Sequence, residues 1–268
     1  MNPNWFGIVC TVVVFLAFFV SYVLAGRLSE GTRAVWTGLL VLLALPGASF
    51  AGYYAHLVDV PAWYYEFRSW QRIESALILI GVAGGFLASF FSAIPRILVL
   101  LIVSALVSVP FVKPFLGPLP EGSLQDQWQG DICLQSTYST CGAASAATIL
   151  RHHGITVSES ALAREAYSYQ GGTEVWYLAR ALRKRNLEAT MHVTTDLPHR
   201  FQAHSLPAIV GVRFGHTGHF IAVLSRNDEQ FHIGDPLRGS EVLELGELEQ
   251  RYKFTGFWME VHSSHPMR

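Results

Sequence analysis

The chain has 268 residues, of which 51% are hydrophobic and only 15% are charged, with a formal net charge of −1. Because soluble domains usually carry roughly a quarter charged residues, this composition disfavours an ordinary soluble enzyme. The near-zero net charge gives no basic excess to meet phosphate groups, which argues against nucleic-acid binding, and three cysteines are too few for a disulfide scaffold.

The charged residues are distributed unevenly along the chain. Residues 1–120 hold six Lys or Arg and four Asp or Glu, whereas residues 121–268 hold thirteen and sixteen. The first part contains apolar runs of about the 20 residues that a helix needs to cross a bilayer. The run Ser75–Val112 has Arg96 as its only charge and is long enough for two spans. We therefore predict an all-α transmembrane region over residues 1–112, with four spans at about 6–25, 34–54, 75–93 and 95–112.

The residues that flank these spans indicate whether the first span is cleaved and how the chain is oriented in the membrane. A signal peptide begins with basic residues, but none precedes the first span. We therefore expect this span to be retained and not cleaved. Trp63-Tyr64-Tyr65 and Trp70, between the second and third spans, are typical of a membrane interface, and we expect them to form an interfacial anchor. Lys and Arg are divided evenly between the two sides, although Arg27 and Arg33 after the first span favour an N-terminus and a C-terminal domain outside the cytoplasm.

A proline- and glycine-rich stretch follows the last span. It predicts a linker over residues 113–123, because proline does not continue a helix. Residues 124–268 then form a second domain that is large enough to bury its own core.

The second domain begins with a helix that carries a cysteine. Small residues followed by Ile149 and Leu150 predict a buried helix over residues 141–153, which Gly154 ends. Cys141 lies at the N-terminus of this helix, where unpaired N–H groups and the helix macrodipole favour a thiolate over a thiol. A second, amphipathic helix is predicted over residues 173–185.

Strands are predicted in the rest of the domain. Residues rich in Val, Ile and Phe, separated by turn residues, predict strands over residues 187–193, 206–213, 219–226 and 230–235. A short helix over residues 245–252 and a last strand over residues 256–261 complete the pattern. A cysteine-bearing helix followed by an antiparallel sheet describes an α+β domain.

Three polar residues complement Cys141 in this arrangement. His219 begins one predicted strand and Asp235 ends the next, so a hairpin brings their side chains together. Such a carboxylate fixes the tautomer of the imidazole, which can then take the proton of the thiol. Gln135 offers an amide donor that, with the backbone N–H of Cys141, can stabilise an oxyanion.

The order and spacing of five short motifs resemble those of the C39 family of cysteine peptidases over roughly residues 131–261: Gln135, Cys141-Gly142, His153-Gly154, His219-Phe220 and Asp235-Pro236. These are papain-like domains, best known from bacteriocin-exporting ABC transporters, where they remove leader peptides after a Gly-Gly pair. The resemblance implies a papain-like α+β fold. It also implies that Cys141 is the nucleophile, His219 the general base, Asp235 its orienting carboxylate and Gln135 the oxyanion donor, with no metal ion or cofactor.

The chain also departs from those exporters. Thr140 stands where many members of the family have aspartate, at a position outside the catalytic set. The phosphate-binding motif Gly-x-x-x-x-Gly-Lys-Ser/Thr is absent from the sequence, and four spans are fewer than an exporter half needs. The resemblance therefore implies the peptidase on a different membrane anchor, so it does not by itself determine which protein is cleaved or on which side of the membrane.

From these observations we expect a membrane-anchored cysteine peptidase that cleaves peptide bonds after small residues such as Gly-Gly. Its predicted location is the bacterial cytoplasmic membrane, its predicted substrate a peptide or protein, and a transport or secretion partner would be encoded elsewhere. Two alternatives stay open: a catalytically silent peptidase-like module that docks peptides for a transport or signalling partner, and a papain-like amidase or cell-wall hydrolase. Cys133 is expected to be a free thiol and not a disulfide partner of Cys141.

Overall fold

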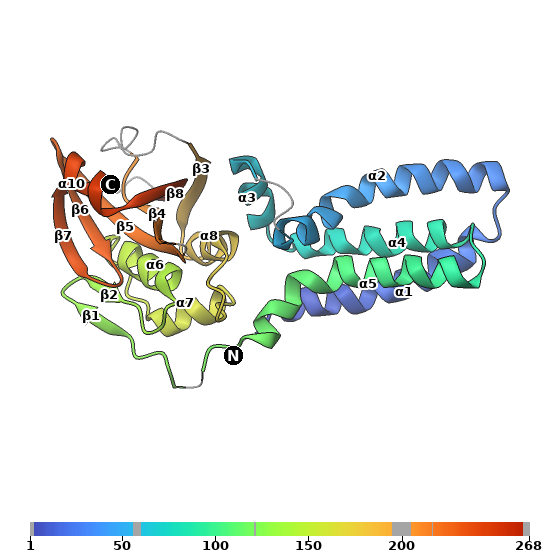
Figure 1. The fold of residues 1–268 in the computed structure, drawn as a ribbon, viewed down its shortest axis with the longest axis horizontal. Helices are drawn as coiled ribbons and strands as arrows, with labels where there is room; N and C mark the ends of the chain where they lie inside the picture. The colour runs from blue at the N-terminus through green and yellow to red at the C-terminus, as the bar shows by residue number, and fades with distance from the viewer. Residues whose placement is uncertain (1–2, 56–59, 121, 195–204, 216, 265–268) are drawn as a thin grey trace. The chain divides into compact units, whose positions relative to one another are not determined.

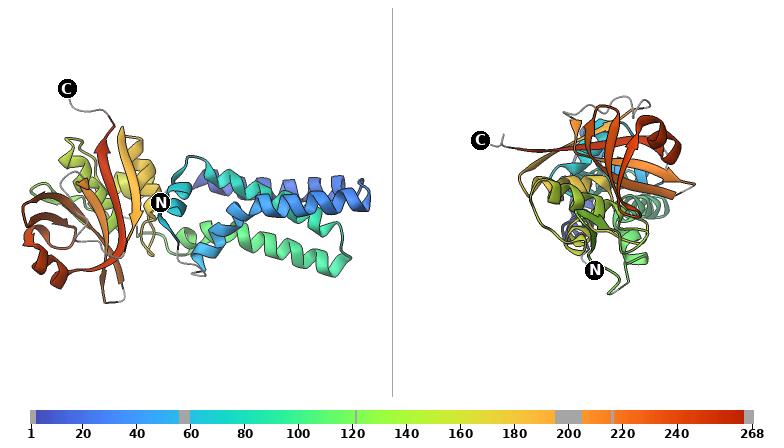
Figure 2. Two further views of the ribbon diagram at one scale, coloured as in Figure 1. Left: turned by 90° about the horizontal axis from the view of Figure 1, so that it is seen from above. Right: turned by 90° about the vertical axis from the view of Figure 1, so that its left-hand side faces the viewer.

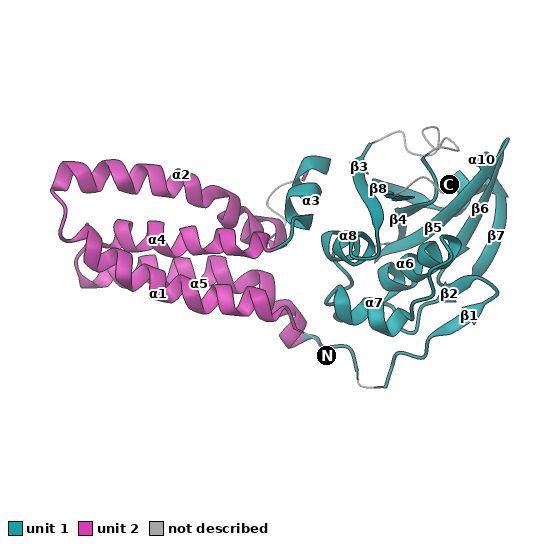
Figure 3. Ribbon diagram, turned by 180° about the vertical axis from the view of Figure 1, so that it is seen from behind, with its two compact units in different colours: residues 1–2, 61–71, 117–268 teal, residues 3–60, 72–116 magenta. Residues whose placement is uncertain are grey.

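The computed structural model describes residues 3–55, 60–120, 122–194, 205–215 and 217–264. The chain forms two units (Figure 3). The helical unit consists of Pro3–Val60 and Arg72–Leu116. The α+β unit consists of Gly117–Arg268 together with Pro61–Gln71, a segment that lies between two parts of the helical unit in the sequence.

Among its described residues, the helical unit contains three helices that are long and apolar enough to cross a membrane: α1 (Trp5–Ala25), α2 (Glu30–Tyr54) and α5 (Ala93–Leu116). The third predicted span is a shorter helix, α4 (Leu77–Ala88), preceded by the 3-10 turn η1 (Ile73–Ala76). It ends at Ala88, where the hydroxyl of Ser89 donates to the carbonyl oxygen of Phe86. Helix α3 (Ala62–Ser69) and the segment η1–α4 are together long and apolar enough to form a fourth span, but the two are bent by 99° relative to each other. Four predicted spans therefore fit the structure approximately.

The last helix of this unit runs further than the sequence indicated. Helix α5 continues through Pro110 and Pro114 to Leu116, into the stretch predicted as a linker. A proline removes only its own N–H donor, and helices in a membrane tolerate it where neighbouring groups satisfy the freed carbonyls.

Glycines set the close packing of α4 on α1. A Cβ atom at Gly81 would overlap the carbonyl oxygen of Val14, and one at Gly85 would overlap the carbonyl oxygen of Phe18. Because the two glycines are four residues apart, they share one face of α4. This is the small-residue packing by which membrane helices bring their backbones together.

The α+β unit is built on a six-stranded antiparallel sheet (Figure 1). In spatial order its strands are β3 (Leu187–Val193), β8 (Lys253–Ser263), β4 (Ala208–Phe214), β5 (Thr217–Asn227), β6 (Gln230–Asp235) and β7 (Gly239–Glu244). A separate hairpin pairs β1 (Gln127–Gln129) with β2 (Ile132–Leu134). The helices in the described residues of this unit are α3, α6 (Cys141–His152), α7 (Glu159–Glu165), α8 (Val175–Arg183) and α10 (Leu245–Arg251). The predicted α+β class is confirmed.

Helix α6 packs against the middle of the sheet, where it contacts β4, β5 and β6 (Figures 1 and 2). A Cβ atom at Gly234 of β6 would lie 3.0 Å from Thr148 of α6, so this face of the sheet approaches the helix closely. Since strand side chains alternate, the neighbouring Ile233 points to the other face, where it joins a buried cluster with Val223 and with Leu248 of α10. Both faces of the sheet are therefore covered, which gives the candidate site a rigid base.

Candidate active site

Cys141 is the first residue of α6, as the sequence predicts. It is buried, and so are the nine residues that follow it in the helix. Gly142 allows this packing, because a Cβ atom there would lie 2.9 Å from Leu178 Cδ1 of α8. The backbone N–H of Cys141 belongs to the first turn of α6, where N–H groups have no acceptor within the helix. The N-terminal end of α6 therefore presents backbone N–H donors beside the residue that carries the thiol.

His219 and Asp235 are brought together by the neighbouring strands β5 and β6. The Nε2 atom of His219 lies 2.9 Å from Oδ1 of Asp235, and both side chains are buried. Because Nε2 contacts the carboxylate, Nδ1 is the ring nitrogen left to face the thiol, and Cys141 is among the neighbours that raise the pKa of the imidazole. The pairing of β5 with β6 thus accounts for the contact between the two side chains.

The surroundings of His219 favour its protonated form. Burial alone would lower the pKa of the imidazole, but the hydrogen bonds to Asp235 and Cys141, with the charges of both partners, raise that pKa to about 9. The imidazole therefore holds a proton at neutral pH that it can pass to a leaving group.

Asp235 is held by two further donors that the sequence did not reveal. The backbone N–H of Leu237 donates to Oδ1 at 2.9 Å, and the hydroxyl of Tyr252, which follows α10, donates to Oδ2 at 2.8 Å. Burial would raise the pKa of Asp235, but the hydrogen bonds from His219, Leu237 and Tyr252 outweigh it and lower that pKa. Burial and the nearby carboxylates raise the pKa of Tyr252, so that it remains a donor. The carboxylate is thus kept ionised and oriented.

Gln135 lies in the turn between β2 and α6. Its backbone N–H donates to the carbonyl oxygen of Pro236 at 2.9 Å, which joins this turn to the residue after Asp235. Its side-chain Nε2 donates to the carbonyl oxygen of Thr137 at 2.8 Å. An amide nitrogen carries two hydrogens, so one donor of Nε2 is left over for a ligand.

Glu159, at the start of α7, supports the same turn and was missed in the sequence. Its buried carboxylate accepts a hydrogen bond from the backbone N–H of Ser136 at 2.8 Å and another from the Ser136 hydroxyl. No sequence pattern indicates this role, because a glutamate directly after Ser158 is typical of the first turn of an ordinary helix. Glu159 fixes the residue next to Gln135 and so positions the proposed oxyanion donor.

Cys133 is the other cysteine of the α+β unit. It is a free, buried thiol, and burial with the charges of Glu159 and Asp126 raises its pKa to about 12. Within the described residues, no group of three or more His, Cys, Asp or Glu is arranged to hold a metal ion.

Residues 129–265 match the Peptidase C39 family. An uncharacterised protein of Methanothermobacter marburgensis is 33% identical over 108 residues, which are 40% of this chain and 72% of that protein. An uncharacterised protein of Methanothermobacter thermautotrophicus is 32% identical over the same shares of the two chains.

Solved structures are similar as well. The peptidase domain of Streptococcus ComA, a bifunctional ABC transporter involved in a quorum-sensing pathway, is 21% identical with a TM-score of 0.43, over 48% of this chain and 96% of that domain. A double-glycine-motif protease from an AMS/PCAT transporter, solved with its leader peptide, is 21% identical with a TM-score of 0.42, over 55% of this chain and 98% of that protease. The family match covers half of the sequence with every residue of the candidate site, and the chain belongs to the Peptidase C39 family.

Proposed function

We propose that this protein is a membrane-anchored cysteine peptidase, in which Cys141 is the nucleophile, His219 the acid and base, and Asp235 the group that orients the histidine. The observation that carries the proposal is the 2.9 Å contact of His219 Nε2 with Asp235 Oδ1. The influence of Cys141 on the pKa of the same imidazole supports it. Membership of a peptidase family supports the class of reaction.

Acylation follows from these positions. The Cys141 sulfur attacks the carbonyl carbon of the peptide bond, and the negative charge moves to the carbonyl oxygen. The backbone N–H of Cys141 and the free hydrogen of Gln135 Nε2 stabilise this oxyanion. His219 gives its proton to the leaving amine, the C–N bond breaks, and a thioester with Cys141 remains.

Deacylation reverses the proton movement. The neutral imidazole takes a proton from water, and the hydroxide attacks the thioester carbon. The same two donors hold the second oxyanion, and the C–S bond then breaks. A carboxylic acid product leaves, and the thiolate–imidazolium pair is restored.

The substrate class and location are also part of the proposal. We propose a peptide or protein substrate that is cleaved after small residues such as Gly-Gly, with a transport or secretion partner that delivers or receives it. Membership of the Peptidase C39 family supports the peptide class of the substrate. Helices α1, α2 and α5 support integration into a membrane, which we take to be the bacterial cytoplasmic membrane. The arginines that follow α1 favour the extracytoplasmic side for the α+β unit.

The proposal is tested by alkylating the full-length protein in detergent with iodoacetamide and with the peptidase probe E-64 at pH 6. We expect Cys141 to react rapidly and Cys133 to stay unmodified, since burial keeps the Cys133 thiol protonated. In His219→Gln, whose amide can still donate to Asp235, the labelling rate of Cys141 should fall about 10-fold or more. Equal rates in the two proteins would favour the silent docking module instead.

Gln135→Ala should slow hydrolysis of a peptide substrate by about 10²–10³-fold in kcat, with a much smaller change in KM. The reason is that the amide hydrogen acts on the oxyanion, which exists only in the transition state and intermediates. Gln125→Ala, at an exposed glutamine before β1, serves as the control. A loss confined to KM would show that Gln135 binds the substrate and does not stabilise the oxyanion.

A further inference from the structure

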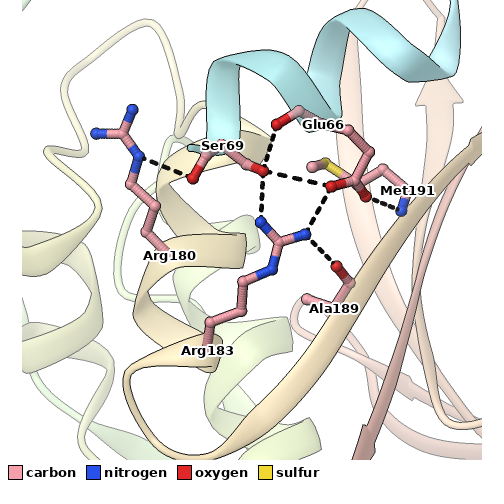
Figure 4. Close-up of polar contacts among 6 residues, drawn as sticks. All are labelled: Glu66, Ser69, Arg180, Arg183, Ala189 and Met191. Atoms are coloured by element: carbon pink, nitrogen blue, oxygen red, sulfur yellow. Dashed lines mark hydrogen bonds and ion pairs between the residues drawn. The ribbon is translucent and has the colours of Figure 1, made fainter. Parts of the chain in front are cut away.

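Helix α3 occupies an unusual place in the chain. In the sequence it lies between α2 and α4 of the helical unit, yet it belongs to the α+β unit, where it contacts α8 and β3 (Figure 4). The chain thus leaves the apolar helices after α2, docks one helix on the α+β unit, and returns to the apolar helices at η1.

A half-buried ion pair lies at the centre of this contact. The Nη2 atom of Arg183, in the last turn of α8, lies 2.7 Å from Oε2 of Glu66 in α3. The other terminal nitrogen of Arg183 donates to the hydroxyl of Ser69, one turn further along α3. One guanidinium group therefore binds two side chains of α3. The planar group with its fixed N–H donors favours such a two-pronged contact.

The same residues cover the open edge of the sheet. Strand β3 is an edge strand, and its backbone N–H at Met191 donates to Oε1 of Glu66 at 2.7 Å. Its carbonyl oxygen at Ala189 accepts a hydrogen bond from Arg183. An uncovered edge strand exposes a row of such groups and is prone to unwanted pairing. Glu66 and Arg183 thus form an ion pair and also provide hydrogen-bond partners for two backbone groups of β3.

Further contacts fix the C-terminal end of α3. Arg180 of α8 donates to the carbonyl oxygens of Arg68 at 2.7 Å and of Ser69 at 3.3 Å, which are groups that a helix leaves unpaired at its end. The guanidinium of Arg68 lies 4.3 Å from the ring centre of Trp176 in α8. The positive charge of Arg180 thus lies at the C-terminal end of α3, where the helix dipole is negative, and this attraction favours the docking.

The aromatic residues of α3 and its C-terminal end fall into a packed group and an exposed group. Tyr65 stacks on Trp176 and meets Phe257 of β8 edge to face at 5.3 Å between ring centres. Trp63 and Trp70 are 67% and 59% exposed. Exposure of these two indoles suits the interfacial anchor that the sequence predicts, whereas Tyr65 packs on the α+β unit.

We propose that α3 is a clamp: a helix that lies between α2 and α4 in the sequence, docks within the α+β unit and so gives the chain a second connection to this unit, independent of the covalent link at Leu116–Gly117. The docking has a topological consequence. Residues 71 and 117 must lie on one side of the membrane, so the chain between them crosses an even number of times. Because α5 is long enough to cross, η1–α4 crosses too, and a locally thinned bilayer accommodates its short length.

The clamp is tested with full-length protein that carries a specific protease site inserted after the exposed Gly122. After cleavage in mild detergent, we expect the C-terminal fragment to co-elute with the membrane-spanning fragment in gel filtration. Glu66→Ala, Arg180→Ala or Arg183→Glu should each release it about 10-fold faster or more, since each removes hydrogen bonds to a charged group. Asp131→Asn, which breaks the exposed pair of Asp131 with Arg151, should not change retention. Immediate separation of the unmutated fragments would overturn the proposal.

The topology is tested separately in a cysteine-free chain with single cysteines at exposed positions. An impermeant maleimide should label Trp70→Cys and Asp131→Cys from the same side of sealed vesicles. It should label Leu28→Cys and Ser92→Cys from the opposite side. Any other distribution overturns the proposal. Neither measurement involves hydrolysis, so a failed clamp leaves the peptidase proposal untouched, and a failed peptidase assignment leaves the clamp untouched.

Discussion

Replacing Cys141 by alanine is expected to abolish peptide hydrolysis, with kcat falling by about 10⁴-fold or more. No other thiol can take over. Cys133 is buried with a pKa raised to about 12, and Cys10 lies in the apolar helix α1. Alanine is smaller than cysteine by one sulfur atom and fits a helix in which five of the first seven residues are Ala or Gly. The loss should therefore be chemical, with the fold intact.

Two measurements separate this result from a folding defect. The thermal unfolding temperature of Cys141→Ala should stay near that of the unmodified protein, and a substrate peptide should still bind, because the sulfur acts on the bond to be broken. Cys133→Ala is the matched control, a buried thiol in the same unit whose removal should spare kcat. Turnover that persists in Cys141→Ala would refute the peptidase mechanism.

Much of the candidate site could be predicted because its parts are local in sequence. The small-residue run after Cys141 and the stop at Gly154 define α6 by helix rules that need no tertiary contact. His219 and Asp235 meet because two consecutive strands form a hairpin, the nearest kind of pairing in a sheet. The strands at β3, β5 and β6 were likewise found from their β-branched and aromatic residues.

The residues that were missed depend on long-range contacts or lack an apolar pattern. Tyr252 reaches Asp235 only because the chain after α10 folds back on β6. Strand β7 was not predicted, since its sequence Gly-Ser-Glu-Val-Leu-Glu belongs to a half-exposed edge strand with little apolar signal. The docking face of α3 could not be foreseen either, because Tyr65 and Arg68 have the composition of a membrane interface. Only their partners on α8 and β8 reveal the second role.

The rate of hydrolysis should fall at alkaline pH, with an apparent pKa near that of His219. Because that pKa is raised to about 9, the imidazolium that protonates the leaving amine persists through neutral pH and is lost as the pH rises through about 9. The linked stability has the same direction: it is fully present below the ordinary histidine value of about 6.5 and lost towards pH 9. The lowered pKa of Asp235 contributes stability that is lost as the pH falls through the acid range. We expect kcat/KM, measured from pH 5 to 10.5, to show this alkaline limb.

Asp235→Asn should move the alkaline limb to lower pH by about 1–3 units, because the negative charge that favours the imidazolium is gone. The imidazole should keep its orientation. The Leu237 N–H and the His219 Nε2 both meet Oδ1, so the amide oxygen takes that place, while the amide nitrogen faces the Tyr252 hydroxyl, which can accept. Asp131→Asn, the same exchange at a side chain that is 80% exposed, is the control and should leave the profile in place. If the limb stayed near pH 9 in Asp235→Asn, the carboxylate would not be what raises the pKa of His219. Cys141 would then be the partner that raises it.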